Sequence, residues 1–110
     1  MSEFTCIVQR DQAAHRATDQ LGQGLRAAHR RFIDDKPVAI TWMVAEPGDM
    51  FTAGEPSTSS IVGAAIDRET TAAEREQLLT AICDLWTDVT GCTDHEILAA
   101  VTRPEQLSSR

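Results

Sequence analysis

Apolar side chains in the first part of the chain follow two different periods. Residues 3–9 alternate between two largely apolar faces, which predicts a β-strand. Residues 12–32 place apolar or small side chains three or four positions apart, which predicts one amphipathic helix with Asp11 as its N-cap. That stripe consists of Ala14, Ala17, Leu21, Leu25, Ala28 and Phe32. Gly22 and Gly24 each weaken the helix by up to about 1 kcal/mol relative to alanine, so packing must hold its middle.

A second strand is predicted at residues 38–45, directly after Pro37 ends the helical stretch. This segment is apolar on both of its alternating faces, which predicts a strand buried on both sides. Residues 46–60 follow with proline, glycine and serine at several positions. That composition indicates a long connection with turns, including a short hairpin around residues 50–53.

The second half of the chain repeats the order of the first. Residues 61–66 predict a strand, and Thr71 with Glu74 forms the signature of a helical capping box. A stripe of apolar positions continues from there until Gly91, which predicts the end of a helix, and residues 97–101 predict a last strand. The stripe consists of Leu78, Ile82, Leu85 and Val89.

Two tandem βαβ units therefore define the expected fold class, α+β, with one four-stranded sheet and two helices on one face. The units are expected at residues 3–46 and 60–102, with a linker at 47–59. A single domain is expected over residues 1–103, with a short tail at 104–110. Helices on one face leave the other apolar face bare, so we expect the sheets to pack together in a closed oligomer.

Composition and charge narrow the function classes. The chain has 110 residues and a mass of 12.0 kDa, with 10 basic and 17 acidic residues, a net charge of -7 and a pI near 4.8. Such a charge disfavours binding to nucleic acid and to anionic membrane surfaces. No stretch approaches the ~18 apolar residues of a membrane span, and the start does not resemble a signal peptide, so a cytoplasmic location is expected.

The sequence offers few candidate metal ligands and contains no tyrosine. Cys92 and His95 form a C-x-x-H pair, but two ligands without a second pair are too few for structural zinc, so no metal is predicted. No cofactor-binding motif is present, so no cofactor is predicted either. Tyrosine is absent, which excludes a tyrosine hydroxyl as a general acid.

Several short motifs, in order along the chain, resemble the tautomerase superfamily and within it the cis-3-chloroacrylic acid dehalogenase group. The resemblance spans about residues 1–104. The matching segments are Met1 to Cys6 with Gln9-Arg10, Ala28-His29, Ile40 to Val44, Gly48 to Gly54, Ala65-Ile66 with Thr70, and Glu76 to Leu79. This resemblance implies an assembly such as a homotrimer.

The resemblance also assigns candidate catalytic residues. In that family an amino-terminal proline is exposed when methionine is removed, and its amine acts as base, acid or imine-forming group; the matching residue here is Ser2. A primary amine with an unperturbed pKa of about 7.7–8.0 still allows such chemistry. His29 matches the family's histidine that helps bind the substrate carboxylate. The alternatives are an amino terminus without a catalytic role and a histidine that faces solvent.

Other family positions have changed in this chain. Asp67 and Thr70 stand where the family has two carboxylate-binding arginines, with Arg68 shifted by one residue. An acid there would repel small anionic substrates. Arg68 and Arg26, the latter in a basic cluster on the first helix, are the remaining candidates for substrate binding, although a solvated helix face is the commoner role of such a cluster. The family's tyrosine and its acidic residue beyond the last strand have no counterpart.

Two functions follow from the resemblance and from these changes. One is a tautomerase-type enzyme that acts on a small carbonyl, enol or 2-oxo acid compound through the amine of Ser2, with His29 as its partner. The other is a non-catalytic member that keeps the oligomeric scaffold as a ligand-binding or accessory subunit. Removal of Met1 and the capture of an imine at residue 2 distinguish them.

Overall fold

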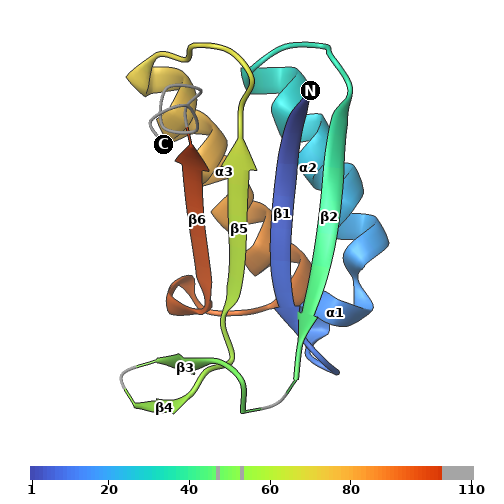
Figure 1. Ribbon diagram of the computed structural model, residues 1–110, viewed down its shortest axis with the longest axis vertical. Helices are drawn as coiled ribbons and strands as arrows, with labels where there is room; N and C mark the ends of the chain where they lie inside the picture. Colours follow the sequence, from blue (N-terminus) through green and yellow to red (C-terminus); the bar gives the residue numbers. More distant parts are fainter. Residues whose placement is uncertain (47, 53, 103–110) are drawn as a thin grey trace, which may run out of the picture.

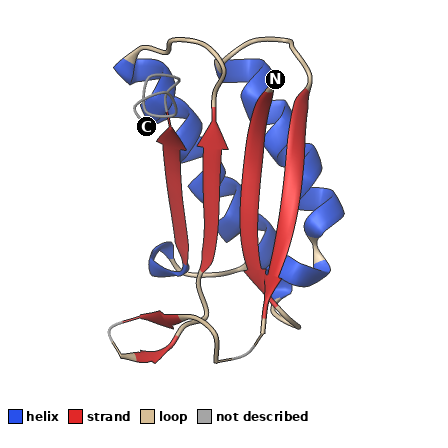
Figure 2. Ribbon diagram, viewed as in Figure 1, coloured by secondary structure: helices blue, strands red, loops and turns tan. Residues whose placement is uncertain are grey.

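A single mixed sheet with helices on one side forms the core of the computed structural model, which describes residues 1–46, 48–52 and 54–102 (Figures 1 and 2). Its strands lie in the order β2-β1-β5-β6. Their bounds are Ser2–Gln9 for β1, Val38–Ala45 for β2, Ser60–Ala65 for β5 and Ile97–Thr102 for β6. The helices are α1 (Ala13–Arg16), α2 (Thr18–Phe32) and α3 (Ala72–Thr90), with a 3₁₀ turn at Asp94–Glu96.

Each half of the chain contributes one parallel strand pair, joined by a helical crossover. β1 pairs in parallel with β2, and β5 pairs in parallel with β6. The halves meet where β1 and β5 run antiparallel, with Cys6 opposite Val62. This arrangement confirms the predicted α+β class and the two βαβ units. The expected tail at 104–110 lies outside the described residues.

The first helical segment differs from its prediction. Instead of one helix over residues 12–32, α1 and α2 are separated at Ala17, whose φ and ψ are -119° and 24°. Asp11 is not the N-cap: it has a left-handed φ of 68°, and Gln12 takes the N-cap position without a side-chain hydrogen bond. The predicted stripe is confirmed from Ala14 to Ala28, whose members lie in or against the core, but Phe32 lies outside it. The period of the stripe passes unchanged across the break at Ala17, which is visible only in the backbone.

The second helix follows its sequence signals closely. Thr71 accepts a hydrogen bond from the Glu74 amide, and Glu74 accepts one from the Thr71 amide, which completes the predicted capping box. Gly91 ends α3 with a φ of 73°, a conformation that glycine adopts without strain. In the connecting segment, β3 (Phe51–Thr52) and β4 (Glu55–Pro56) form the expected short hairpin.

The two long helices approach each other closely at Gly24. A Cβ atom placed there would overlap Cδ1 of Leu85 on α3. The equivalent atom at Gly22 would find its nearest neighbour at 3.8 Å, on Ile40. One glycine therefore makes room for the neighbouring helix, whereas the other does not need to be glycine.

The two faces of the sheet have different surroundings. Phe4, Cys6 and Val8 of β1 are fully buried beneath the helices. On β2, the predicted burial on both sides is wrong for the single chain, because the side chains of Met43 and Val44 are 51% and 38% exposed. No described helix covers the outer face of the sheet (Figure 2), and none of the described helices is long and apolar enough to cross a membrane.

Candidate functional site

The amino-terminal end of β1 meets the loop that follows β5 at one end of the two inner strands of the sheet (Figure 1). Ser2 is the first residue of β1, lies opposite Val38 in the register with β2 and is only 4% exposed. Because β5 runs antiparallel to β1, the residues that follow the last residue of β5 lie at the same end of the sheet as the first residue of β1. The fold thereby brings Asp67 beside Ser2, although the two are far apart in the sequence.

Asp67 binds both the hydroxyl of residue 2 and the terminal amine. Ser2 Oγ donates a hydrogen bond to Asp67 Oδ1 at 3.0 Å and accepts one from the Asp67 amide at 3.0 Å. The amine of Met1 forms an ion pair with Asp67 Oδ2 at 3.1 Å. These contacts, the amine first and then the serine hydroxyl, lower the pKa of the Asp67 carboxyl group. The side chain is therefore a carboxylate that holds two potential nucleophiles together.

His29 lies beneath β1, near the carboxyl end of α2. Its ring packs edge-on against Phe4 with 6.3 Å between the ring centroids, and the residue is only 2% exposed. The predicted alternative of a solvent-facing histidine is therefore wrong. Nε2 lies 3.8 Å from the Asp34 carboxylate and has no hydrogen-bond partner among the described residues.

Burial keeps His29 in its neutral form. Burial lowers the pKa of the imidazole, and this outweighs the opposing effect of the negative charges on Asp34 and Asp67. A helix carboxyl terminus favours the charged form of a histidine, but that attraction does not compensate for the loss of water here. His29 is thus a buried neutral group at neutral pH.

Arg68 connects the end of α2 to the beginning of α3. Its guanidinium donates to the Ile33 carbonyl at 2.7 Å, to Glu74 Oε2 at 3.1 Å and to Asp34 Oδ2 at 3.4 Å. The hydrogen bond with Glu74 is the main cause of a raised pKa for Arg68. Both acids compete with any substrate carboxylate for this cation, because its donors already have partners within the chain.

Arg26, a residue of α2, also contacts this end of the sheet. Its Nη1 donates to the Val38 carbonyl at 2.7 Å, and Val38 is the residue opposite Ser2. At the second family arginine position, the carbonyl and hydroxyl of Thr70 accept hydrogen bonds from Arg75. The four predicted site residues, Ser2, His29, Arg26 and Arg68, therefore come to one end of the fold.

Sequence reasoning treated Asp67 only as a repulsive replacement for an arginine. Asp67 contacts Ser2 because β5 pairs with β1. The one sequence signal for this contact was the position of Asp67 directly after the strand predicted at residues 61–66. No sequence signal identified Asp34, which lies 3.8 Å from Nε2 of His29. For metal binding, residues 1–46, 48–52 and 54–102 contain no group of three or more suitable His, Cys, Asp or Glu side chains.

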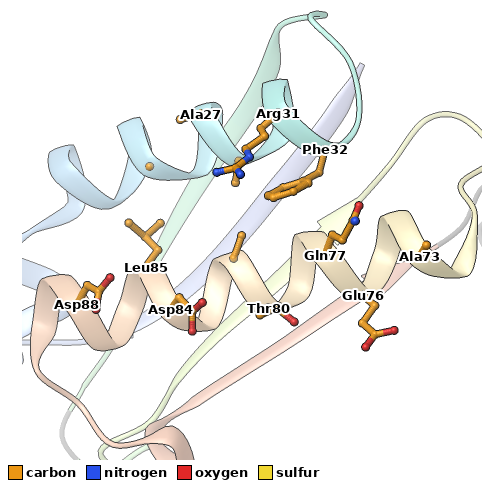
Figure 3. Close-up of a pocket in the computed structure, with 13 residues that line it drawn as sticks. Ala27, Arg31, Phe32, Ala73, Glu76, Gln77, Thr80, Asp84, Leu85 and Asp88 are labelled. Atoms are coloured by element: carbon orange, nitrogen blue, oxygen red, sulfur yellow. The ribbon is translucent and has the colours of Figure 1, made fainter.

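A separate groove of about 750 Å³ runs between α2 and α3 on the outer side of the helical layer (Figure 3). Arg31 and Phe32 line it from α2, and Asp84 and Asp88 line it from α3. None of the predicted site residues lines this groove. Its size alone does not connect it to the chemistry at the end of β1.

No protein-family model and no curated protein matches the chain. Among solved structures, native Ps01740 superposes with a TM-score of 0.84 and 27% identity over 92% of both chains. N1, a member of the cis-3-chloroacrylic acid dehalogenase family, has a TM-score of 0.83 and 18% identity over 92% of this chain and 73% of N1. A fused 4-OT crystallised as a symmetric trimer has a TM-score of 0.78 and 17% identity over 92% and 84% of the two chains.

These similarities agree with the resemblance predicted from the sequence motifs. The chain has the fold of tautomerase-superfamily structures, including a member of the cis-3-chloroacrylic acid dehalogenase family. Ser2 lies at the first position of the first strand of that fold.

Proposed function

We propose that this protein is a tautomerase-type enzyme that acts on a small carbonyl or enol compound through its amino-terminal amine. The observation that carries the proposal is the position of the chain start, where Ser2 is 4% exposed and its hydroxyl lies 3.0 Å from the Asp67 carboxylate. Removal of Met1 would transfer the amine to Ser2 itself, two bonds from the carbon that bears Oγ. The fold of the family supports this use of the site.

An amine at this position supports two kinds of chemistry. As the free base it removes a proton next to a carbonyl group, and as a nucleophile it forms an imine with the carbonyl carbon. The free base of the amine is the reactive form in both reactions. Asp67, a carboxylate bound to the Ser2 hydroxyl, would place a negative charge near the ammonium group that forms when the amine takes up a proton.

The charges around the amine favour uncharged substrates over small anions. Asp67 is negative at neutral pH, and the cation of Arg68 is neutralised by Asp34 and Glu74. Two unit charges at ~4 Å interact by about 1 kcal/mol in water and more strongly in a partly buried site. In this proposal His29 supports the site as a neutral group beneath Phe4, and Arg26 and Arg68 hold the surrounding backbone.

Intact mass and chemical trapping test the proposal. The mass of the purified protein should lack Met1, and borohydride should trap pyruvate methyl ester on residue 2 more readily than it traps pyruvate. Lys36 is the only lysine in the chain, so K36R removes the one side-chain amine that competes while preserving its charge. Retention of Met1, or the absence of any adduct at residue 2 in the K36R protein, would refute the role of the amine.

Self-association is the second part of the proposal, and we expect a homotrimer. The fused 4-OT of similar fold forms a symmetric trimer, and the outer face of the sheet exposes the large apolar side chains of Met43 and Leu98 in the single chain. Packing of these faces would remove apolar surface from water. Native mass spectrometry of the full chain should give three copies, and a monomer at micromolar concentration would contradict this.

A non-catalytic scaffold is the alternative, and one observation favours it. Arg68, the only arginine next to the family's substrate-binding positions, is engaged by Asp34 and Glu74. The two functions differ in turnover: the enzyme should accelerate tautomerisation of an uncharged enol such as an arylenol ketone, whereas the scaffold should bind without turnover. S2P provides a useful comparison, because it installs the secondary amine that the family uses.

A further inference from the structure

Serine differs from the family's proline by a hydroxyl group as well as by the type of amine. After removal of Met1, Ser2 would carry its amine and its hydroxyl on adjacent carbons, which is the arrangement of a 1,2-amino alcohol. We propose that this residue captures small uncharged aldehydes as a five-membered cyclic N,O-acetal, an oxazolidine, with Asp67 as the proton acceptor. The inference rests on the proposed function in one respect, since it needs the free amine of residue 2.

The contacts of the Ser2 hydroxyl hold its oxygen in place and direct its proton to Asp67. Oγ is held from two directions, because it donates to Asp67 Oδ1 and accepts from the Asp67 amide, both at 3.0 Å. Ser2 is 4% exposed, so the hydroxyl is fixed rather than free to turn in solvent. One oxygen lone pair remains for attack on a carbon atom, and the hydroxyl proton already points to the carboxylate.

Asp67 can accept the proton of the Ser2 hydroxyl. Its Oδ1 binds that hydroxyl, and its Oδ2, which holds the terminal amine of Met1 at 3.1 Å, loses this partner when Met1 is removed. These contacts lower the pKa of Asp67, so the acceptor is ionised at neutral pH. The Asp67 side chain is 38% exposed, so a small molecule can reach it from solvent at this end of the sheet.

The reaction proceeds in two balanced steps. The amine adds to the aldehyde carbon, and the adduct takes up one proton from solvent and loses one water molecule to form the protonated imine. The Ser2 hydroxyl then loses its proton to Asp67 while Oγ forms a bond to the imine carbon, and the electron pair of the C=N π bond moves to nitrogen. The product is a neutral ring with a secondary amine, and the sequence reverses when water is added back.

Aldehydes fit this reaction better than 2-oxo acids. The ring carbon becomes tetrahedral between two atoms of a buried residue, and an aldehyde brings only one substituent and a hydrogen to that carbon. A 2-oxo acid would bring two substituents, of which one is an anion next to Asp67. The ligand class is therefore a small aldehyde without a negative charge.

Carbon-13 NMR distinguishes the ring from an open imine. The protein with K36R is mixed with acetaldehyde labelled at the carbonyl carbon, since this leaves the terminal amine as the only primary aliphatic amine. The chain with Ser2 should give a saturated N,O-acetal carbon, and S2T should give the same because it retains the amino alcohol. S2A, which lacks the hydroxyl, should give only an unsaturated imine carbon.

The outcomes separate this inference from the proposed function. An imine carbon in both Ser2 and S2A proteins overturns the ring but leaves the amine chemistry intact. No adduct in any of the three proteins overturns both. D67N should slow ring formation by about 10²-fold while imine formation in D67N/S2A continues, as expected for loss of a general base. Equal rates of ring formation with Asp67 and with asparagine would overturn the role of Asp67, and circular dichroism confirms that each variant is folded.

Discussion

The two faces of the sheet lie in different environments. Along β1, Phe4 and Cys6 are 1% and 0% exposed beneath the helices. On the opposite face, Met43 of β2 and Leu98 of β6 are 51% and 61% exposed, and no described element covers them. The helical face is therefore completed within one chain, whereas the outer face is apolar without a cover. Substitutions on the two faces should differ in kind, in folding on one and in assembly on the other.

Truncation of Trp86 should have the largest effect, because it removes the bulkiest side chain from the helical face. Trp86 is 1% exposed and packs against Trp42 with 6.4 Å between ring centroids. W86A should lower the free energy of unfolding by about 3–5 kcal/mol in urea denaturation, as is typical for a buried aromatic residue. W86F should cost distinctly less. Similar losses in the two variants would mean that this site adjusts to a lost ring.

Alanine at the two glycines of α2 should have different effects. G24A should be less stable than G22A by about 1 kcal/mol, since its Cβ would overlap the end of the Leu85 side chain and force that side chain to move. G22A is the matched control and should stabilise by up to about 1 kcal/mol through helix propensity. The double variant G24A/L85A should destabilise by less than the sum of its two single variants. Additivity of the two changes would contradict a direct clash.

His29 should make the helical face sensitive to pH. Because burial lowers its pKa in the folded state below the ordinary value of 6.5, the folded protein binds fewer protons than the unfolded chain. Stability is then complete above about pH 6.5–7 and falls as the pH decreases, by no more than about 1.4 kcal/mol per pH unit. H29Q should reduce this slope, whereas H95Q, at an exposed residue, should retain it. An unchanged slope in H29Q would assign the effect to other groups.

A charge on the outer face should have the smallest effect on folding of the isolated chain. L98D should leave the far-ultraviolet circular dichroism unchanged, because Leu98 is 61% exposed in the single chain. Its elution in size-exclusion chromatography should shift to the monomer, since three carboxylates would meet in an apolar interface. T80D carries the same charge on the helical side and should retain the oligomer. Dissociation of both variants would mean that net charge, not position, controls assembly.

Much of the fold followed from local patterns in the sequence. The strands, the capping box at Thr71 and the helix end at Gly91 depend on neighbours within a few residues, so alternation and turn chemistry predicted them. The break at Ala17 did not follow, because the apolar stripe continues across it. The role of Gly24 also escaped prediction, since the cost of glycine is local but its benefit comes from Leu85 on another helix.

The candidate site was predictable only in part for the same reason. Ser2, His29 and Arg68 were found through their motif positions. The state of each depends on contacts across the fold: Ser2 is bound by Asp67, His29 is buried under Phe4, and Arg68 is engaged by two acids. Motif positions identify which residues meet at one end of the sheet. The charge and the burial of those residues depend on other residues that lie outside the motif.

Cys6 is a buried thiol on the helical face, and its rate of chemical labelling depends on the opening of the protein. The thiol is in the central strand at 0% exposure, and burial raises its pKa to about 12. A thiol alkylating reagent requires the thiolate, so it should modify Cys6 only in molecules that have opened. Cys83 and Cys92 are only partly buried and should react first. The slow third addition of label would then report how often the native protein unfolds, without any denaturant or engineered probe.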